Sequence, residues 1–114
     1  MLPAANRLRH ARDITRVYRC GRYGTGDFLS IKAAKNGRLG SRATFVVAKK
    51  VSKKAVIRNR IRRRLAEIMR IDWQTVAPGY DIVVTVHQDI SMTTGDELKN
   101  GLTTALTKSG SHAL

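Results

Sequence analysis

The 114-residue sequence has only one cysteine, Cys20, so no disulfide bond can form within the chain. A lone cysteine is typical of proteins from a reducing compartment, and we expect a cytoplasmic location. No apolar run approaches the length of a membrane span, and no apolar stretch follows the basic residues near the N-terminus. We therefore expect no secretory signal and no membrane partner.

Acidic residues are scarce in the first 66 positions, which hold only Asp13 and Asp27 against 19 lysines and arginines. The net charge of this part is +17, whereas residues 67–114 carry a net charge of −3. Residues 28–66 contain no acidic side chain at all. Solubility does not require this asymmetry, and its self-repulsion is costly unless a polyanion neutralises it. We therefore expect nucleic acid as the partner, with an anionic membrane surface as the alternative.

The sequence also lacks the residue groupings of a catalytic or metal site. His10, His87 and His112 lie far apart, without cysteine or carboxylate companions at ligand spacing. The eight carboxylates form no motif of a two-metal nuclease, and Cys20 beside Gly21 fits a packed or half-exposed thiol better than a nucleophile. We expect no catalytic residue, no bound metal and no cofactor in the chain itself.

The apolar pattern predicts both helices and strands. Ile14, Val17 and Tyr18 form a narrow stripe at helical spacing, and residues 82–86 form an apolar run typical of a buried strand. Thr94 and Glu97 form a capping box that opens a last helix. The predicted elements are a helix at 11–19, strands at 28–33 and 43–48 joined by a turn at 35–41, a helix at 54–70, a strand at 80–86 and the final helix.

This order of helix, two or three strands, helix, strand and helix predicts an α+β two-layer sandwich, with helices packed on one sheet. The length suits one domain with a single core. We expect this domain to span residues 1–108, followed by a flexible tail at residues 109–114.

The predicted helix at 54–70 has the clearest chemical pattern. Seven of the twelve residues at 53–64 are basic, and the apolar residues Ile57, Ile61 and Leu65 share the opposite face. Arginine suits phosphate because its planar guanidinium donates two hydrogen bonds at once, and an asparagine can reach a base edge or a ribose hydroxyl. The predicted RNA-binding residues are Lys49, Lys50, Lys53, Lys54, Arg58, Asn59, Arg60, Arg62 and Arg63.

A run of charge is more often a solvated helix face than a binding site. A solvated face normally pairs acids with bases one turn apart, whereas this run has no acidic partner before Glu67. The pattern therefore favours a nucleic-acid contact. Arg64 lies at the apolar edge, and we expect its stem to lie along the core.

Residues 49–63 read Lys-Lys-x₄-Ala-Val-Ile-Arg-Asn-Arg-Ile-Arg-Arg, which resembles the signature of the bacterial ribonuclease P protein subunit. The triplet Arg58-Asn59-Arg60 is its most specific part. The resemblance extends over most of the chain, through the segments at 6–8, 13–18, 44–50 and 79–81.

The resemblance implies a fold with an unusual left-handed βαβ crossover, of the kind seen in the second domain of a ribosomal protein. From the pattern alone we would expect a right-handed one. It also implies that the basic helix contacts the catalytic RNA subunit, which carries the catalytic Mg²⁺ ions and cuts precursor tRNA to give the mature 5′ end. This chain would be the accessory, non-catalytic subunit of that endoribonuclease, with no obligate protein partner.

In the family, a cleft between the first helix and the sheet binds the 5′ leader of precursor tRNA. The resemblance places Ile14, Tyr18, Phe28, Ile31 and His87 there. Relatives often have phenylalanine at the positions of Ile14 and Tyr18, an aromatic residue near Ile31 and arginine in place of His87. The aromatic rings of Tyr18, Phe28 and also Tyr23 could stack on unpaired bases, although core packing is equally plausible for Phe28.

Two other functions would share parts of this pattern. A structural ribosomal protein would have a similar size and a similar basic helix, but the spacing of the signature argues against it. A nuclease that acts without RNA would need the acid, base or metal groups that the sequence lacks.

Overall fold

The computed structural model describes residues 2–112. Its helices are α1 (Ala11–Cys20), α2 (Ala55–Ile71) and α3 (Gly95–Ser109), with short 3-10 turns η1 (Ala4–Asn6) and η2 (Trp73–Thr75). Its strands are β1 (Arg22–Thr25), β2 (Leu29–Lys35), β3 (Arg42–Val47) and β4 (Tyr80–Val86). The predicted α+β order is confirmed, and β1 is a strand that the sequence pattern did not locate.

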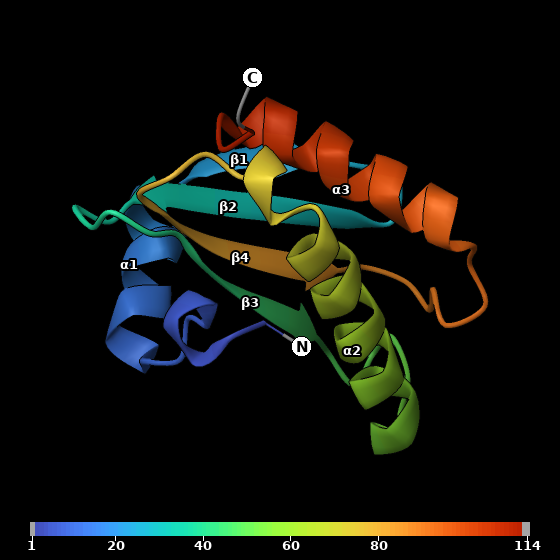
Figure 1. The fold of residues 1–114 in the computed structure, drawn as a ribbon. Helices are drawn as coiled ribbons and strands as arrows, with labels where there is room; N and C mark the ends of the chain where they lie inside the picture. The colour runs from blue at the N-terminus through green and yellow to red at the C-terminus, as the bar shows by residue number, and fades with distance from the viewer. Residues whose placement is uncertain (1, 113–114) are drawn as a thin grey trace.

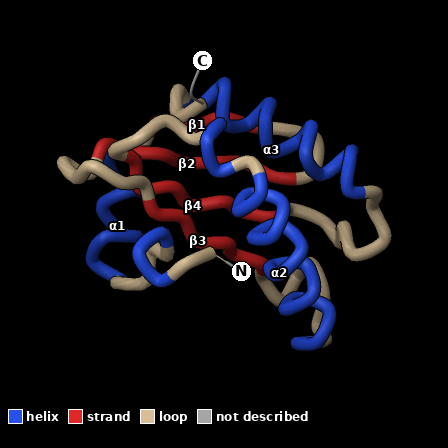
Figure 2. Tube along the Cα trace, viewed as in Figure 1, coloured by secondary structure: helices blue, strands red, loops and turns tan. Residues whose placement is uncertain are grey.

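The four strands form one mixed sheet in the order β1-β2-β4-β3. The pairs β1–β2 and β2–β4 are antiparallel, whereas β3 and β4 are parallel. Helices α2 and α3 cover one face of this sheet, and α1 packs alone on the other (Figure 1). Figure 2 shows that the β3 end of the sheet lies next to the N-terminal segment.

The connection from β3 through α2 to β4 is left-handed. With α2 in front of the sheet and both strands turned to point upward, β4 lies to the left of β3 (Figure 1). Almost all such crossovers are right-handed, so the sequence pattern alone would give the wrong hand. The left-handed crossover that the family resemblance implies is confirmed.

Strand alternation divides the core into two clusters. In β2, Leu29, Ile31 and Ala33 point toward α2 and α3, where they join the main core. Ala34 points to the other face and joins a small cluster with Val17 of α1. On this side the sheet is covered by α1 and by Leu8 of the N-terminal segment, and Tyr23 of β1 stays exposed.

A buried carboxylate fixes α1 to this second face. Asp81 is fully buried at the start of β4 and accepts hydrogen bonds from Arg42 Nε at 2.8 Å, Arg16 Nη2 at 2.6 Å and Asn36 Nδ2 at 3.0 Å. Burial alone would raise the pKa of Asp81, but the hydrogen bonds from Arg42 and Asn36 and the two nearby guanidinium charges outweigh it. The pKa of Asp81 therefore lies below its ordinary value, and the carboxylate is charged at neutral pH.

The end of the chain differs from the flexible tail that the sequence predicts after residue 108. Ser109 is the last residue of α3, and both Ser109 and Ser111 are buried. Gly110 takes a left-handed conformation that ends the helix, and Ala77 N–H donates to Ser111 O at 2.7 Å. Residues 109–112 therefore belong to the folded part, and residues 113–114 lie outside the described residues.

Candidate RNA interface

Helix α2 docks on the sheet with one face and exposes its basic side chains on the other. Ile61 and Leu65 are buried in the main core. Arg58 and Arg62 are half-buried, and the other predicted RNA-binding residues are exposed, namely Lys49, Lys50, Lys53, Lys54, Asn59, Arg60 and Arg63. The structure thus brings the nine residues together on one helix and the turn before it, and its only acid, Glu67, lies nearer the other end and pairs with Arg70.

Two arginines of this helix hold loops. Arg58 Nη1 donates to Ser52 O at 2.9 Å, which braces the turn that carries the four lysines. Arg64 donates to three main-chain carbonyls of the loop between β4 and α3, those of Ile90, Ser91 and Thr93. This use of Arg64 was missed, because the sequence pattern gives the edge of the helix face but not the loop that lies beside it.

The sheet face beside α1 carries a second group of polar and aromatic side chains. Tyr18 is 44% exposed on α1 and Tyr23 is 58% exposed on β1. Strand register places Tyr23 beside Lys32, and Ser30 Oγ lies 2.8 Å from His87 Nε2. Hydrogen bonds from the side chains of Thr25 and Ser30 lower the pKa of Tyr23. This α1-side face combines two aromatic rings with a lysine and a histidine, which suits single-stranded RNA.

The predicted cleft residues divide between the two sides of the sheet. Ile14 packs beside Val17 on the side of α1 that faces the sheet, and Tyr18 and His87 lie on the same side of the sheet. Ile31 is fully buried in the main core, and Phe28 packs against that core next to Gly101 of α3. The placement of Phe28 and Ile31 in the cleft is therefore corrected.

The physical reason is the two-residue period of a strand. Ser30 and Lys32 point to the α1 side, so Ile31 between them must point to the opposite side. Lys32 itself was missed as a candidate, and so was the pairing of Ser30 with His87. The signal that could have found both is strand parity relative to Ala34, once the two faces are assigned.

Within residues 2–112, no three histidine, cysteine, aspartate or glutamate side chains are grouped so that they could hold a metal ion. None of the helices in this range is both long enough and apolar enough to cross a membrane. Cys20 is a free, exposed thiol at the end of α1.

Known proteins resemble this chain over nearly its whole length. The sequence profile of the family described as Ribonuclease P matches residues 2–110. The ribonuclease P protein component of a Pseudanabaena species is 42% identical over 110 residues, with 92% of this chain and 95% of that protein covered. The RNase P protein from Thermotoga maritima superposes with a TM-score of 0.76 at 29% identity, over 84% of this chain and 90% of that one. The RNase P protein from Staphylococcus aureus has the same fold, with a TM-score of 0.77 at 24% identity, over 98% and 95% of the two chains. The chain belongs to the ribonuclease P protein family.

Proposed function

We propose that this chain is the protein subunit of ribonuclease P and binds the catalytic RNA through the basic face of α2. The observation that carries the proposal is that this basic face lies on the exposed side of a helix whose other side is packed in the core. The helix is anchored by buried Ile61 and Leu65, so its exposed arginines and lysines are held on a rigid support. Rigid presentation lowers the entropy lost when a guanidinium takes up a phosphate.

We infer that the α1-side face holds the 5′ leader of precursor tRNA. Tyr18 and Tyr23 offer exposed rings on which unpaired bases can stack, and Lys32 and His87 offer donors for the backbone. This face lies on the opposite side of the sheet from the α2 layer. One small chain can then contact the catalytic RNA and its substrate at the same time.

The role of the protein in this proposal is electrostatic and positional. Catalytic RNA and precursor tRNA are both polyanions, and a chain with a net charge of +14 placed between them reduces their repulsion. The Mg²⁺ ions expected on the RNA supply the metal chemistry of phosphodiester hydrolysis. The side chains of this protein bind and orient RNA, and we assign none of them to a bond-breaking step. We place the chain in the cytoplasm.

The test is reconstitution with the cognate catalytic RNA and a precursor tRNA at low magnesium concentration. Cleavage should be much faster with the protein than with the RNA alone, and protein freed of RNA should cut nothing. Magnesium-dependent cleavage by protein that had been treated exhaustively with ribonuclease would contradict this assignment. A structural ribosomal protein would instead co-purify with ribosomal RNA and leave the cleavage rate unchanged.

Matched variants distinguish the function of the α2 face from that of the α1-side face. Arg60→Ala should weaken binding of the catalytic RNA, whereas Tyr18→Leu and Tyr23→Leu should leave it unchanged. The tyrosine variants should instead reduce the preference of the holoenzyme for precursor over mature tRNA. If all three variants lost affinity for the catalytic RNA and preference for precursor tRNA to the same extent, the two faces would not be separate sites.

A further inference from the structure

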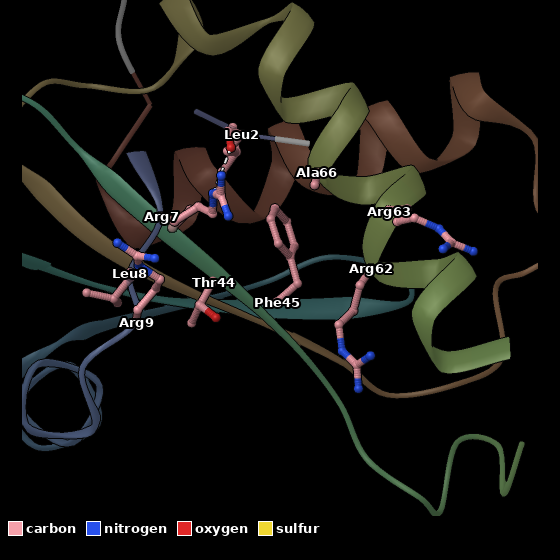
Figure 3. A pocket seen from close by; sticks show the side chains of 10 residues that line it. Leu2, Arg7, Leu8, Arg9, Thr44, Phe45, Arg62, Arg63 and Ala66 are labelled. Atoms are coloured by element: carbon pink, nitrogen blue, oxygen red, sulfur yellow. Dashed lines mark hydrogen bonds between the residues drawn. The ribbon is translucent and has the colours of Figure 1, made fainter. Parts of the chain in front are cut away.

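A small groove lies where the N-terminal segment, the outer edge of β3 and helix α2 meet. Its volume is about 200 Å³, and its apolar lining includes Leu2, Leu8, Phe45 and Ala66. Figure 3 shows the half-buried Phe45 ring rising from β3 between Leu2 and the helix residues Arg62 and Ala66. The volume is below the roughly 300–1,000 Å³ of a typical small-molecule site, so the groove suits one planar ring.

The edge of β3 leaves main-chain hydrogen-bonding groups open beside this ring. Leu8 N–H donates to Ala43 O at 2.9 Å, which shows that the main-chain N–H and C=O of Ala43 point away from β4. Outward-pointing residues alternate along a strand, so the N–H and C=O of Phe45 face the same side. Residues 2–112 supply no main-chain partner for them on that side. A donor and an acceptor therefore adjoin the aromatic ring, as the edge of a nucleobase requires.

The rim of the groove is positively charged. Arg9 comes from the N-terminal segment, and Arg62 and Arg63 come from α2. Arg7 also lines the groove and is held there by a hydrogen bond from its Nε to Leu2 O at 2.9 Å. None of the lining residues is acidic. An apolar aromatic floor with arginines around it matches a base attached to a phosphate backbone better than an apolar peptide.

We propose that this groove takes one unpaired nucleotide of the catalytic RNA, with its base on Phe45 and its flanking phosphates on the arginines of the rim. The proposal rests on the proposed function, because the groove continues the basic face of α2 through Arg62 and Arg63. This groove adds contact with one base to an interface that would otherwise contact only the phosphate backbone of the RNA. The groove would distinguish unpaired from paired nucleotides, because a base within a duplex is stacked and paired and is unable to enter it.

The test compares full-length variants for binding to the catalytic RNA. Phe45→Leu keeps the apolar volume but removes the flat ring, and Ala66→Leu fills the groove from the α2 side. Phe28→Leu is the matched control, because this half-buried phenylalanine packs near Gly101, away from the groove. Both groove variants should raise Kd by roughly 5- to 100-fold, the range for one base stacked on an aromatic side chain. The control should stay within about twofold of the wild type, a change worth less than about 0.5 kcal/mol.

Two further measurements identify the kind of contact. The slope of log K against log salt concentration should not change in Phe45→Leu. In Arg62→Ala the magnitude of this slope should fall by about one, as loss of a phosphate contact does. Base-specific chemical probing of the complex should show one unpaired nucleotide that the wild-type protein protects and Phe45→Leu exposes. Melting temperatures of all variants are measured alongside, and if Phe45→Leu is destabilised, Ala66→Leu gives the decisive comparison.

The outcomes separate this proposal from the one on which it rests. If the wild-type protein does not bind the catalytic RNA, the proposed function fails and the groove proposal fails with it. If the wild type binds and both groove variants match Phe28→Leu in affinity and in probing pattern, only the groove proposal is overturned. A loss of affinity accompanied by one newly reactive nucleotide supports it.

Discussion

Replacing Asp81 by asparagine tests the idea that one buried carboxylate holds α1 on the sheet. Its two oxygens accept four hydrogen bonds, two from Arg42 and one each from Arg16 and Asn36. Asparagine has nearly the same shape, but it carries no charge and offers a single acceptor oxygen. The substitution therefore leaves two guanidinium groups close together with only Asp13, 3.5 Å from Arg42 Nη2, as a counter-ion.

The expected cost follows from how deeply the partners are buried. Removing one member of a buried ion pair costs about 3–5 kcal/mol. The side chain of Arg42 is only 12% exposed, whereas that of Arg16 is 35% exposed and can turn toward solvent. We therefore take the lower end, about 3 kcal/mol, as the loss in the free energy of unfolding. For a domain of this size that loss lowers Tm by roughly 12 °C.

The assay is thermal unfolding of wild type and Asp81→Asn at several pH values. Because the pKa of Asp81 is lowered in the folded protein, its contribution is fully present above the unfolded-state pKa of about 3.9 and disappears as pH falls through the folded-state value. The difference in Tm should therefore be largest near pH 7 and should shrink below about pH 4. Asp27→Asn, which removes the same charge at an exposed position, should change Tm by no more than about 2 °C. A similarly small change in Asp81→Asn would refute the reasoning.

Three further predictions concern single side chains. Arg60→Ala should weaken RNA binding by about 1–3 kcal/mol with Tm unchanged, whereas Arg64→Ala should lower Tm by several degrees, because three loop carbonyls lose their donor; RNA titration and melting curves on both variants check this. His87→Arg should strengthen the preference of the holoenzyme for precursor over mature tRNA, because arginine places a permanent charge and a planar set of donors where His87 stands, and equal precursor preference in both proteins would show that His87 does not touch the leader. Gly24→Ala should lower Tm, because an added Cβ would lie 2.4 Å from the main chain of α3, whereas Gly40→Ala, which meets no atom within 4 Å, should be close to neutral.

The sequence predicts the elements of this fold well because their apolar periods are long and regular. Ile61 and Leu65 of α2 and the run in β4 each give a clear pattern, and both elements lie within two residues of their predicted ends. The sequence does not locate β1, whose four residues are mostly exposed and include Gly24 at the only buried position. Burial of that position is achieved by direct contact of α3 with the strand main chain, which leaves no apolar side chain to detect.

The candidate site was predictable only where one element carries it. The basic face of α2 follows from helical spacing alone, because all its residues share one helix and its preceding turn. The α1-side face is assembled from α1, β1, β2 and β4, so it depends on strand register. The family resemblance placed Ile31 on this face, whereas the alternation of β2 directs its side chain into the main core. The same limit applies to Arg64, whose partners lie 26 to 29 residues away in the sequence.

The acidic side chains that form ion pairs contact cations outside the α2 interface, and this predicts how RNA binding depends on salt concentration. Among residues 2–112, Asp13 and Asp81 pair with Arg42, Asp72 pairs with Lys99, and Glu67 pairs with Arg70. None of the ion pairs in that range involves the basic residues of the α2 interface, so these cations repel one another until RNA arrives. If about five to eight phosphates are neutralised, log K plotted against log salt should fall with a slope of roughly −4 to −7. Added salt should at the same time raise Tm of the free protein slightly, because it screens the same repulsion. A nearly flat binding slope, measured by titration from low to moderate salt, would mean that the positive half of the chain does not hold RNA.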